Sequence, residues 1–191
     1  MPRFIAFLRA INVGGHTVTM PALRALFESL GFAKVETFIA SGNVIFESGS
    51  RSSTALQKKI ETHLHAALGY EVATFLRSDA ELAAIARYQP FSAAAIDAAT
   101  VLNVAFLAEP ASAAAQKSLL RYRCDIDDFH VDGREAYWLC QTKQSESSFF
   151  KVGMEKALGL KTTVRNINTV RRLAEAYPPA SSGRGSRRAP G

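Results

Sequence analysis

Apolar side chains recur along the chain in two patterns, short runs typical of strands and spacings of three and four residues typical of helices. The first half begins with an apolar strand at Arg3–Arg9, and a helix from about Met20 to Leu30 follows. The later elements of this half are strands at Val35–Ile39 and Asn43–Phe46, a helix at Ser53–Leu68 and a strand at Glu71–Arg77. The order strand, helix, strand, strand, helix, strand is that of a ferredoxin-like fold.

The same order begins again after a short helix that ends near Arg87 and an alanine-rich stretch, Tyr88–Ala99, that we interpret as a linker or an irregular crossing segment. Asp132-Gly133 is a strong two-residue hairpin signal between two of the strands. The predicted elements are strands at Val101–Leu107, Ile126–Val131, Glu135–Cys140 and Lys161–Val164, and helices at Ala111–Arg121, Ser147–Leu158 and Asn166–Tyr177. The second half therefore repeats the first and adds one helix.

This pattern predicts an α+β protein of two ferredoxin-like (βαββαβ) halves packed together, with a C-terminal helix and a disordered basic tail. We expect a first half at residues 1–87, a linker at 88–100, a second half at 101–177 and the tail at 178–191. Both alternating sets of side chains are apolar in several strands, so each sheet should be covered on both faces. RNA-recognition domains of this topology leave one face open for stacking on bases, which makes that function less favoured here.

Net charge and composition limit the classes of partner that the protein could bind. The 191 residues carry a net charge of +6, and three of the arginines lie in residues 178–191, which contain no acidic residue. The tail is rich in Pro, Gly, Ser and Arg, a composition typical of disorder. Two cysteines and the lack of an apolar segment of about 18 residues favour a cytoplasmic protein with free thiols and no membrane contact. Nucleic-acid binding through the basic surface and tail stays open as an alternative.

The loop after the first strand is a candidate anion site. Arg9 stands at the end of the strand, and Asn12, Gly14 and Gly15 precede a helix. Glycines permit close approach of the backbone to a ligand, and a helix N-terminus favours anions. A tight structural turn is the alternative interpretation, because the loop matches neither the P-loop nor the dinucleotide-binding pattern.

Two further turns carry polar side chains of the same kind. Ser41 and Asn43 flank a glycine in the predicted hairpin, where a tight turn alone would explain them. Arg165 precedes the last helix, which either Asn166 or Asn168 can cap. An arginine at the positive end of a helix is unfavourable unless an acidic side chain or an anionic ligand lies nearby.

Other candidate chemistry is weak. The run Asp125, Asp127 and Asp128 lacks the spacing of a calcium loop and is interpreted as a solvated acidic turn. Ser147 and Lys151 stand one helical turn apart, but nothing supplies an oxyanion hole for a nucleophile there. The chain contains no GxSxG, HExxH or CxxC sequence. We therefore expect no metal and no cofactor, and the sequence does not decide whether the protein is an enzyme.

Four segments carry a family resemblance: LRAINVGG (Leu8–Gly15), ASGNVIF (Ala40–Phe46), FFKVGMEKALG (Phe149–Gly159) and TTVRNINTVRRLAE (Thr162–Glu175). They are similar to a widespread bacterial family known as domain of unknown function 1697. The resemblance implies two packed ferredoxin-like halves and no particular activity. Its signature positions correspond to Arg9, Asn12, Val13, Gly14, Gly15, Ser41, Gly42, Asn43, Lys156, Arg165, Asn166 and Thr169. Ala10 and Ile167 depart from the family pattern, which usually has Gly and Trp there.

Three functions remain open. The favoured one is binding of a small anion with a phosphate or carboxylate group in a polar site between the halves. It predicts a concave pocket on which several of the signature side chains converge, namely Arg9, Asn12, Ser41, Asn43 and Arg165. A nucleic-acid binder would instead present a continuous basic stripe. A protein-interaction module would bond each signature side chain to local backbone.

Overall fold

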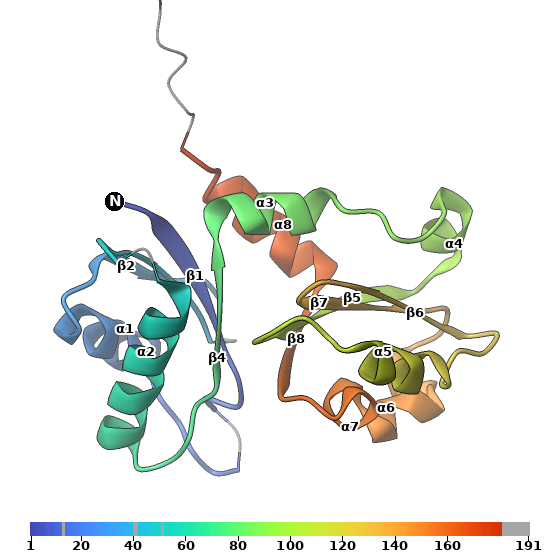
Figure 1. The fold of residues 1–191 in the computed structure, drawn as a ribbon, viewed down its shortest axis with the longest axis horizontal. Helices are drawn as coiled ribbons and strands as arrows, with labels where there is room; N and C mark the ends of the chain where they lie inside the picture. Colours follow the sequence, from blue (N-terminus) through green and yellow to red (C-terminus); the bar gives the residue numbers. More distant parts are fainter. Residues whose placement is uncertain (13, 40–41, 51, 181–191) are drawn as a thin grey trace, which may run out of the picture.

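The computed structural model describes residues 1–12, 14–39, 42–50 and 52–180, and it confirms the α+β class (Figure 1). The first half forms a four-stranded antiparallel sheet in the order β2-β3-β1-β4. Its elements are β1 (Arg3–Leu8), α1 (Met20–Ser29), β2 (Ala33–Thr37), β3 (Asn43–Glu47), α2 (Ser53–Leu68), β4 (Thr74–Ser78) and α3 (Asp79–Arg87). This is the strand order of a ferredoxin-like unit.

The second half forms a sheet of the same order, β6-β7-β5-β8. A short helix, α4 (Ala93–Ala98), precedes it within the stretch predicted as a linker or crossing segment. Its elements are β5 (Val101–Leu107), α5 (Ala113–Leu120), β6 (Asp127–Asp132), β7 (Glu135–Cys140), the 3-10 helix η1 (Gln144–Glu146), α6 (Ser148–Val152), α7 (Met154–Leu158), β8 (Thr162–Asn166) and α8 (Ile167–Ala176).

Each sheet is covered on both faces, as the apolar strands predicted. On the outer face of the first sheet, Leu23 and Phe27 of α1 and Ile60 of α2 pack against β1 and β3. On the outer face of the second sheet, Leu119 of α5 and Phe149 of α6 pack against β5 and β7. The inner faces pack against each other. No described helix is both long and apolar enough to cross a membrane.

The inner core joins the two halves. Phe7 of β1 stacks on Phe106 of β5 with ring centroids 3.9 Å apart and planes 10° apart. Helices α3 and α8 lie against each other over one end of this interface (Figure 1). Their apolar faces, among them Leu82 of α3 and Val170 of α8, enter the same core. Each half thus contributes its last helix to the junction.

One predicted helix is wrong in its extent. The spacing of apolar residues predicted a single helix over Ser147–Leu158, but the chain forms α6 and α7, which meet at Gly153. Gly153 has φ +75°, a left-handed value that ends a right-handed helix. Phe150, which has the helical spacing of the buried Met154 and Ala157, is 54% exposed.

The two halves correspond residue by residue around the stacked phenylalanines. Arg77 of β4 lies opposite Ile5, two residues before Phe7, and Arg165 of β8 lies opposite Val104, two residues before Phe106. Asn43 of β3 lies opposite Phe7, as Glu135 of β7 lies opposite Phe106. The register therefore makes Arg77 and Arg165 counterparts, and likewise Glu135 and Asn43.

Candidate functional site

Two arginines, one from each half, clamp the interface in the same way. The Arg77 guanidinium carbon lies 5.4 Å from the centre of the Phe106 ring, and that of Arg165 lies 5.8 Å from the centre of the Phe7 ring. Arg77 Nη2 donates to the carbonyl oxygen of Leu107 at 3.0 Å, and Arg165 Nη2 donates to that of Leu8 at 3.0 Å. Each arginine thus binds the end of the first strand of the other half.

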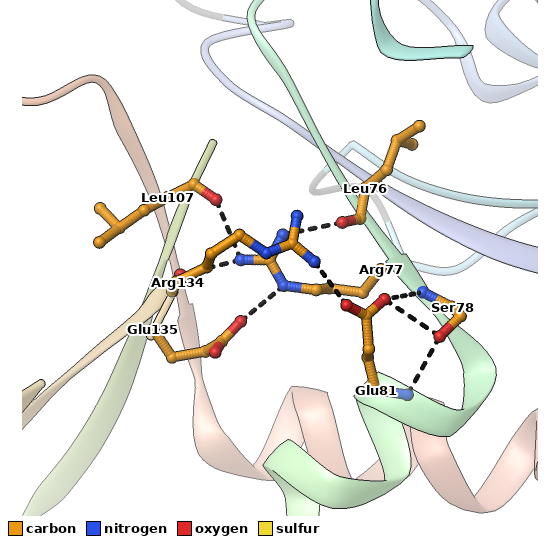
Figure 2. A network of polar contacts seen from close by, with 7 residues as sticks. All are labelled: Leu76, Arg77, Ser78, Glu81, Leu107, Arg134 and Glu135. Atoms are coloured by element: carbon orange, nitrogen blue, oxygen red, sulfur yellow. Dashed lines mark hydrogen bonds and ion pairs between the residues drawn. The ribbon is translucent and has the colours of Figure 1, made fainter. Parts of the chain in front are cut away.

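The surroundings of Arg77 are electrically balanced (Figure 2). Its side chain is 1% exposed, and its Nε donates to Glu135 Oε1 at 2.5 Å. The main-chain carbonyls of Leu76 and Arg134 accept from the two Nη atoms at 2.7 and 2.8 Å. Burial lowers the pKa of Arg77, and the charge of Glu135 opposes that shift. A carboxylate therefore compensates the buried cation.

A second ion pair completes this group, the Arg77 cluster of Arg77, Glu81, Arg134 and Glu135. Arg134 Nη2 donates to Glu81 Oε1 at 2.5 Å. Glu81 also accepts from the Ser78 N–H at 2.8 Å, and the Ser78 hydroxyl accepts from the Glu81 N–H, which together form a capping box at the start of α3. Two arginines and two glutamates leave the cluster without net charge.

Arg165 has a neutral amide where Arg77 has a carboxylate. Its Nε donates to Asn43 Oδ1 at 2.7 Å, and its Nη1 donates to Thr163 Oγ1 at 2.8 Å and to the Val164 carbonyl at 2.9 Å. Together with the Leu8 carbonyl, these are its acceptors among the described residues, and all are uncharged. Burial lowers the pKa of Arg165 to about 10. Asn43 is itself buried and donates to the Phe38 carbonyl at 3.0 Å.

Arg9 adds a second positive charge beside Arg165. It directly follows Leu8, whose carbonyl Arg165 binds, whereas the residue after Leu107 in the other half is Ala108. Arg9 Nε and Nη2 donate to the two carboxylate oxygens of Glu155 at 2.8 and 3.0 Å. Their side chains are 39% and 41% exposed. We call Arg9, Asn43, Glu155 and Arg165 the Arg9–Arg165 cluster, and its side chains carry one net positive charge.

The remaining predicted site residues act locally or stay apart. Asn12 Oδ1 accepts from the Val18 N–H at 2.7 Å and so braces the loop after β1. Asn166 caps α8 and accepts from the Asn168 N–H at 2.8 Å. Gly14 and Gly15 are exposed with φ +69° and +85°. Ser41 lies outside the described residues. Arg9, Asn43 and Arg165 are thus the predicted residues that gather at one place.

The solvated acidic turn predicted for Asp125–Asp128 is wrong for Asp127, which is 1% exposed. Trp138 Nε1 and Ser147 Oγ each donate to its carboxylate at 2.7 Å. Ser147 Oγ also accepts from the Phe149 N–H at 3.0 Å, so it caps α6 and is held by Asp127. This network is structural, and no group of three metal-binding side chains occurs among the described residues.

The Arg77 cluster escaped prediction from the sequence. Arg77 and Glu135 are 58 residues apart and lie in different halves, and neither belongs to a known motif. The available signal was an arginine within an otherwise apolar strand, where a buried charge requires a partner. The identity of that partner follows only from the packing of the sheets.

Comparison with known proteins agrees with this architecture. The fold is similar to that of the conserved bacterial protein SP0830 from Streptococcus pneumoniae, with a TM-score of 0.72 and 24% sequence identity over 93% of this chain and 98% of that one. A search among curated proteins found no match. Residues 1–137 match the family model described as "Protein of unknown function (DUF1697)". Because the matched segment covers more than half of the sequence, the chain belongs to the DUF1697 family.

Proposed function

We propose that the protein binds a small anion, with a phosphate or carboxylate group, at the Arg9–Arg165 cluster. The supporting observation is the difference between two corresponding sites. Asn43 stands where the Arg77 cluster has Glu135, and Thr169 occupies the third helical position where α3 has Glu81. Arg9 stands where the other half has Ala108. Gly42 stands where that cluster has Arg134, and Arg9 brings its own partner, Glu155. The net charge of the side chains therefore changes from zero in the Arg77 cluster to +1 in the Arg9–Arg165 cluster.

Arg9 is the side chain best placed to contact the anion. Its Nε and Nη2 face Glu155, and its partly exposed side chain leaves the Nη1 donors for a ligand. Arg165 is held by the protein and contributes through its charge. Two opposite unit charges about 4 Å apart attract each other by about 4 kcal/mol at an effective dielectric constant of about 20, and the attraction decreases in proportion to distance. An anion on Arg9 would therefore gain from the second arginine without touching it.

Titration with inorganic phosphate and with acetate, followed by calorimetry at fixed ionic strength, tests the proposal. Arg9→Gln should weaken binding at least tenfold, because a charge-assisted hydrogen bond is lost. Arg24→Gln is the matched control, since Arg24 also pairs with a glutamate, Glu28, at 2.9 Å and is half-exposed. Equal affinity in the wild type and Arg9→Gln would contradict the proposal, as would equal losses in both variants.

Asn43→Asp tests the role of Arg165 without removing it. The variant puts a carboxylate at the position that corresponds to Glu135, so the Arg9–Arg165 cluster loses its net positive charge. We expect anion binding to weaken about tenfold, which corresponds to about 1.4 kcal/mol. A thermal unfolding scan verifies that the variant is folded. Undiminished phosphate binding by the folded variant would show that the charge difference between the two sites does not serve binding.

A protein-interaction module is the second candidate, and one observation favours it. Asn12 and Asn166 bond to backbone groups within six residues of themselves, as that function predicts. If the protein is an interaction module, the wild-type protein should show no saturable binding of phosphate or acetate. The same titration therefore separates the two functions.

A further inference from the structure

A cavity with a volume of about 180 Å³ lies beside the Arg77 cluster, between α3 and the β6–β7 hairpin. We call it the tyrosine cavity. Its lining residues are Glu81, Ala84, Ile85, Tyr88, Asp132, Glu135 and Tyr137. None of them belongs to the Arg9–Arg165 cluster, so a ligand in this cavity would bind independently of the proposed anion site.

The charged groups around the cavity sum to one net negative charge. Three carboxylates line it, and two of them are compensated: Glu135 pairs with Arg77 and Glu81 with Arg134, both at 2.5 Å (Figure 2). Asp132 forms no ion pair with the described residues. Asp132 is exposed, and its carboxylate makes the cavity more favourable for a cation than for an anion.

One hydroxyl group in the wall of the cavity forms no hydrogen bond with the described residues. Tyr137 is 1% exposed and lines the cavity, yet its hydroxyl forms no hydrogen bond with that part of the chain. Burial, with the charges of Glu135 and Asp132, raises the pKa of Tyr137, so the hydroxyl stays protonated at neutral pH. A polar atom that lines a cavity and has no partner in the protein is available to water or to a ligand.

Two tyrosine rings also line the cavity. The rings of Tyr88 and Tyr137 lie 5.4 Å apart and are inclined by 47°. His130 holds Tyr88 in place, with Nε2 at 2.9 Å from its hydroxyl. Tyrosine rings attract cations lying within about 6 Å of the ring centre. Carboxylate and aromatic groups in one small cavity are typical of sites for organic cations.

We propose that the tyrosine cavity binds the primary ammonium group of a small organic amine. The ammonium donates to the Tyr137 hydroxyl oxygen and to the Asp132 carboxylate, and its alkyl chain lies against the tyrosine rings and Ile85. A primary ammonium has three N–H donors, which suit several oxygen acceptors in one small space. The volume of the cavity has room for a chain of a few carbon atoms.

Titration with n-butylammonium, followed by calorimetry at constant ionic strength, tests this proposal. We expect saturable binding with a dissociation constant on the order of 1 mM, as befits a ligand of five heavy atoms. 1-Butanol, which has the same size and no charge, should not bind measurably. Arg9→Gln should bind n-butylammonium as tightly as the wild type does. This test therefore does not depend on whether an anion binds at the Arg9–Arg165 cluster.

Two variants locate the ammonium group. Tyr137→Phe removes only the hydroxyl, and Asp132→Asn removes the uncompensated charge; each should weaken binding about tenfold, as expected for a hydrogen bond to a charged group. Asp97→Asn is the control, because Asp97 is an exposed aspartate on α4 outside the cavity lining. The proposal is overturned if n-butylammonium does not saturate the wild type. It is equally overturned if Tyr137→Phe and Asp132→Asn bind as well as Asp97→Asn.

Discussion

Replacing Glu135 by Gln tests whether the buried Arg77 requires a carboxylate. The change keeps the shape of the side chain and an oxygen that can accept from Arg77 Nε, as Asn43 accepts from Arg165. Removing one partner of a buried ion pair costs about 3–5 kcal/mol, because the other charge is left uncompensated. Glu135 is 13% exposed, and three carbonyl acceptors remain for Arg77. We therefore expect the lower limit, a loss of about 3 kcal/mol in the free energy of unfolding.

Urea unfolding at neutral pH, together with a thermal scan, measures this loss. At about 2–4 °C per kcal/mol for a chain of this size, the midpoint should fall by about 6–12 °C. Glu28→Gln is the control, because its half-exposed pair with Arg24 contributes only about 0.3–0.5 kcal/mol. In an Arg77→Met background, Glu135→Gln should cost far less, since the cation that it compensates is gone. A loss below about 1 kcal/mol in the wild-type background would refute the view that Arg77 depends on this carboxylate.

Three single contacts give further predictions about stability. Burial raises the pKa of Glu81, but the Ser78 N–H and Arg134 lower it more, so the net shift is downward. The stability that the Glu81 carboxylate contributes is therefore present above pH 4.5 and is lost as pH falls through the lower pKa of the folded state. In Glu81→Gln the free energy of unfolding, measured by urea unfolding at each pH, should fall less steeply on acidification than in the wild type. Both Gly42 and Gly14 have positive φ, but a Cβ atom at Gly42 would lie 2.9 Å from an Ile11 side-chain carbon, whereas one at Gly14 would meet nothing within 4 Å. In urea unfolding, Gly42→Ala should therefore lower the free energy of unfolding by about 1–3 kcal/mol more than Gly14→Ala. Tyr177→Phe removes the 2.7 Å hydrogen bond to Glu36 and should lower stability by about 1 kcal/mol in a thermal scan.

Much of the fold could be predicted because it depends on local patterns. Apolar runs separated by turn residues identified the strands of both described sheets, and the apolar character of both strand faces predicted sheets covered on both sides. The prediction of one helix over Ser147–Leu158 failed because the spacing of apolar residues does not reveal where the backbone leaves the helical conformation. Gly153 adopts φ +75°, so the residues before it belong to another helix and Phe150 turns outward.

The candidate site was predicted in part. Polar side chains at turns suggested that Arg9, Asn12, Ser41, Asn43 and Arg165 converge. Arg165 and Asn43 are in contact across the junction of the halves, and Arg9 directly follows Leu8, whose carbonyl Arg165 binds. The sequence did not indicate that Glu155 would pair with Arg9, because that contact spans 146 residues. Asp127 was misjudged for a related reason, since its burial depends on Trp138 and Ser147, which reach it from other elements.

The correspondence between the halves is the basis for our proposal that the two arginine clusters have different functions. Both arginines bind a carbonyl at the end of a strand of the other half, so both hold the interface. A carboxylate compensates the charge of a buried arginine, whereas an amide only accepts its hydrogen bond. The first copy has that carboxylate in Glu135, whereas the second has Asn43 and an additional cation in Arg9. The difference leaves one net positive charge in a cluster that includes the partly exposed Arg9, and this is where we propose that an anion binds.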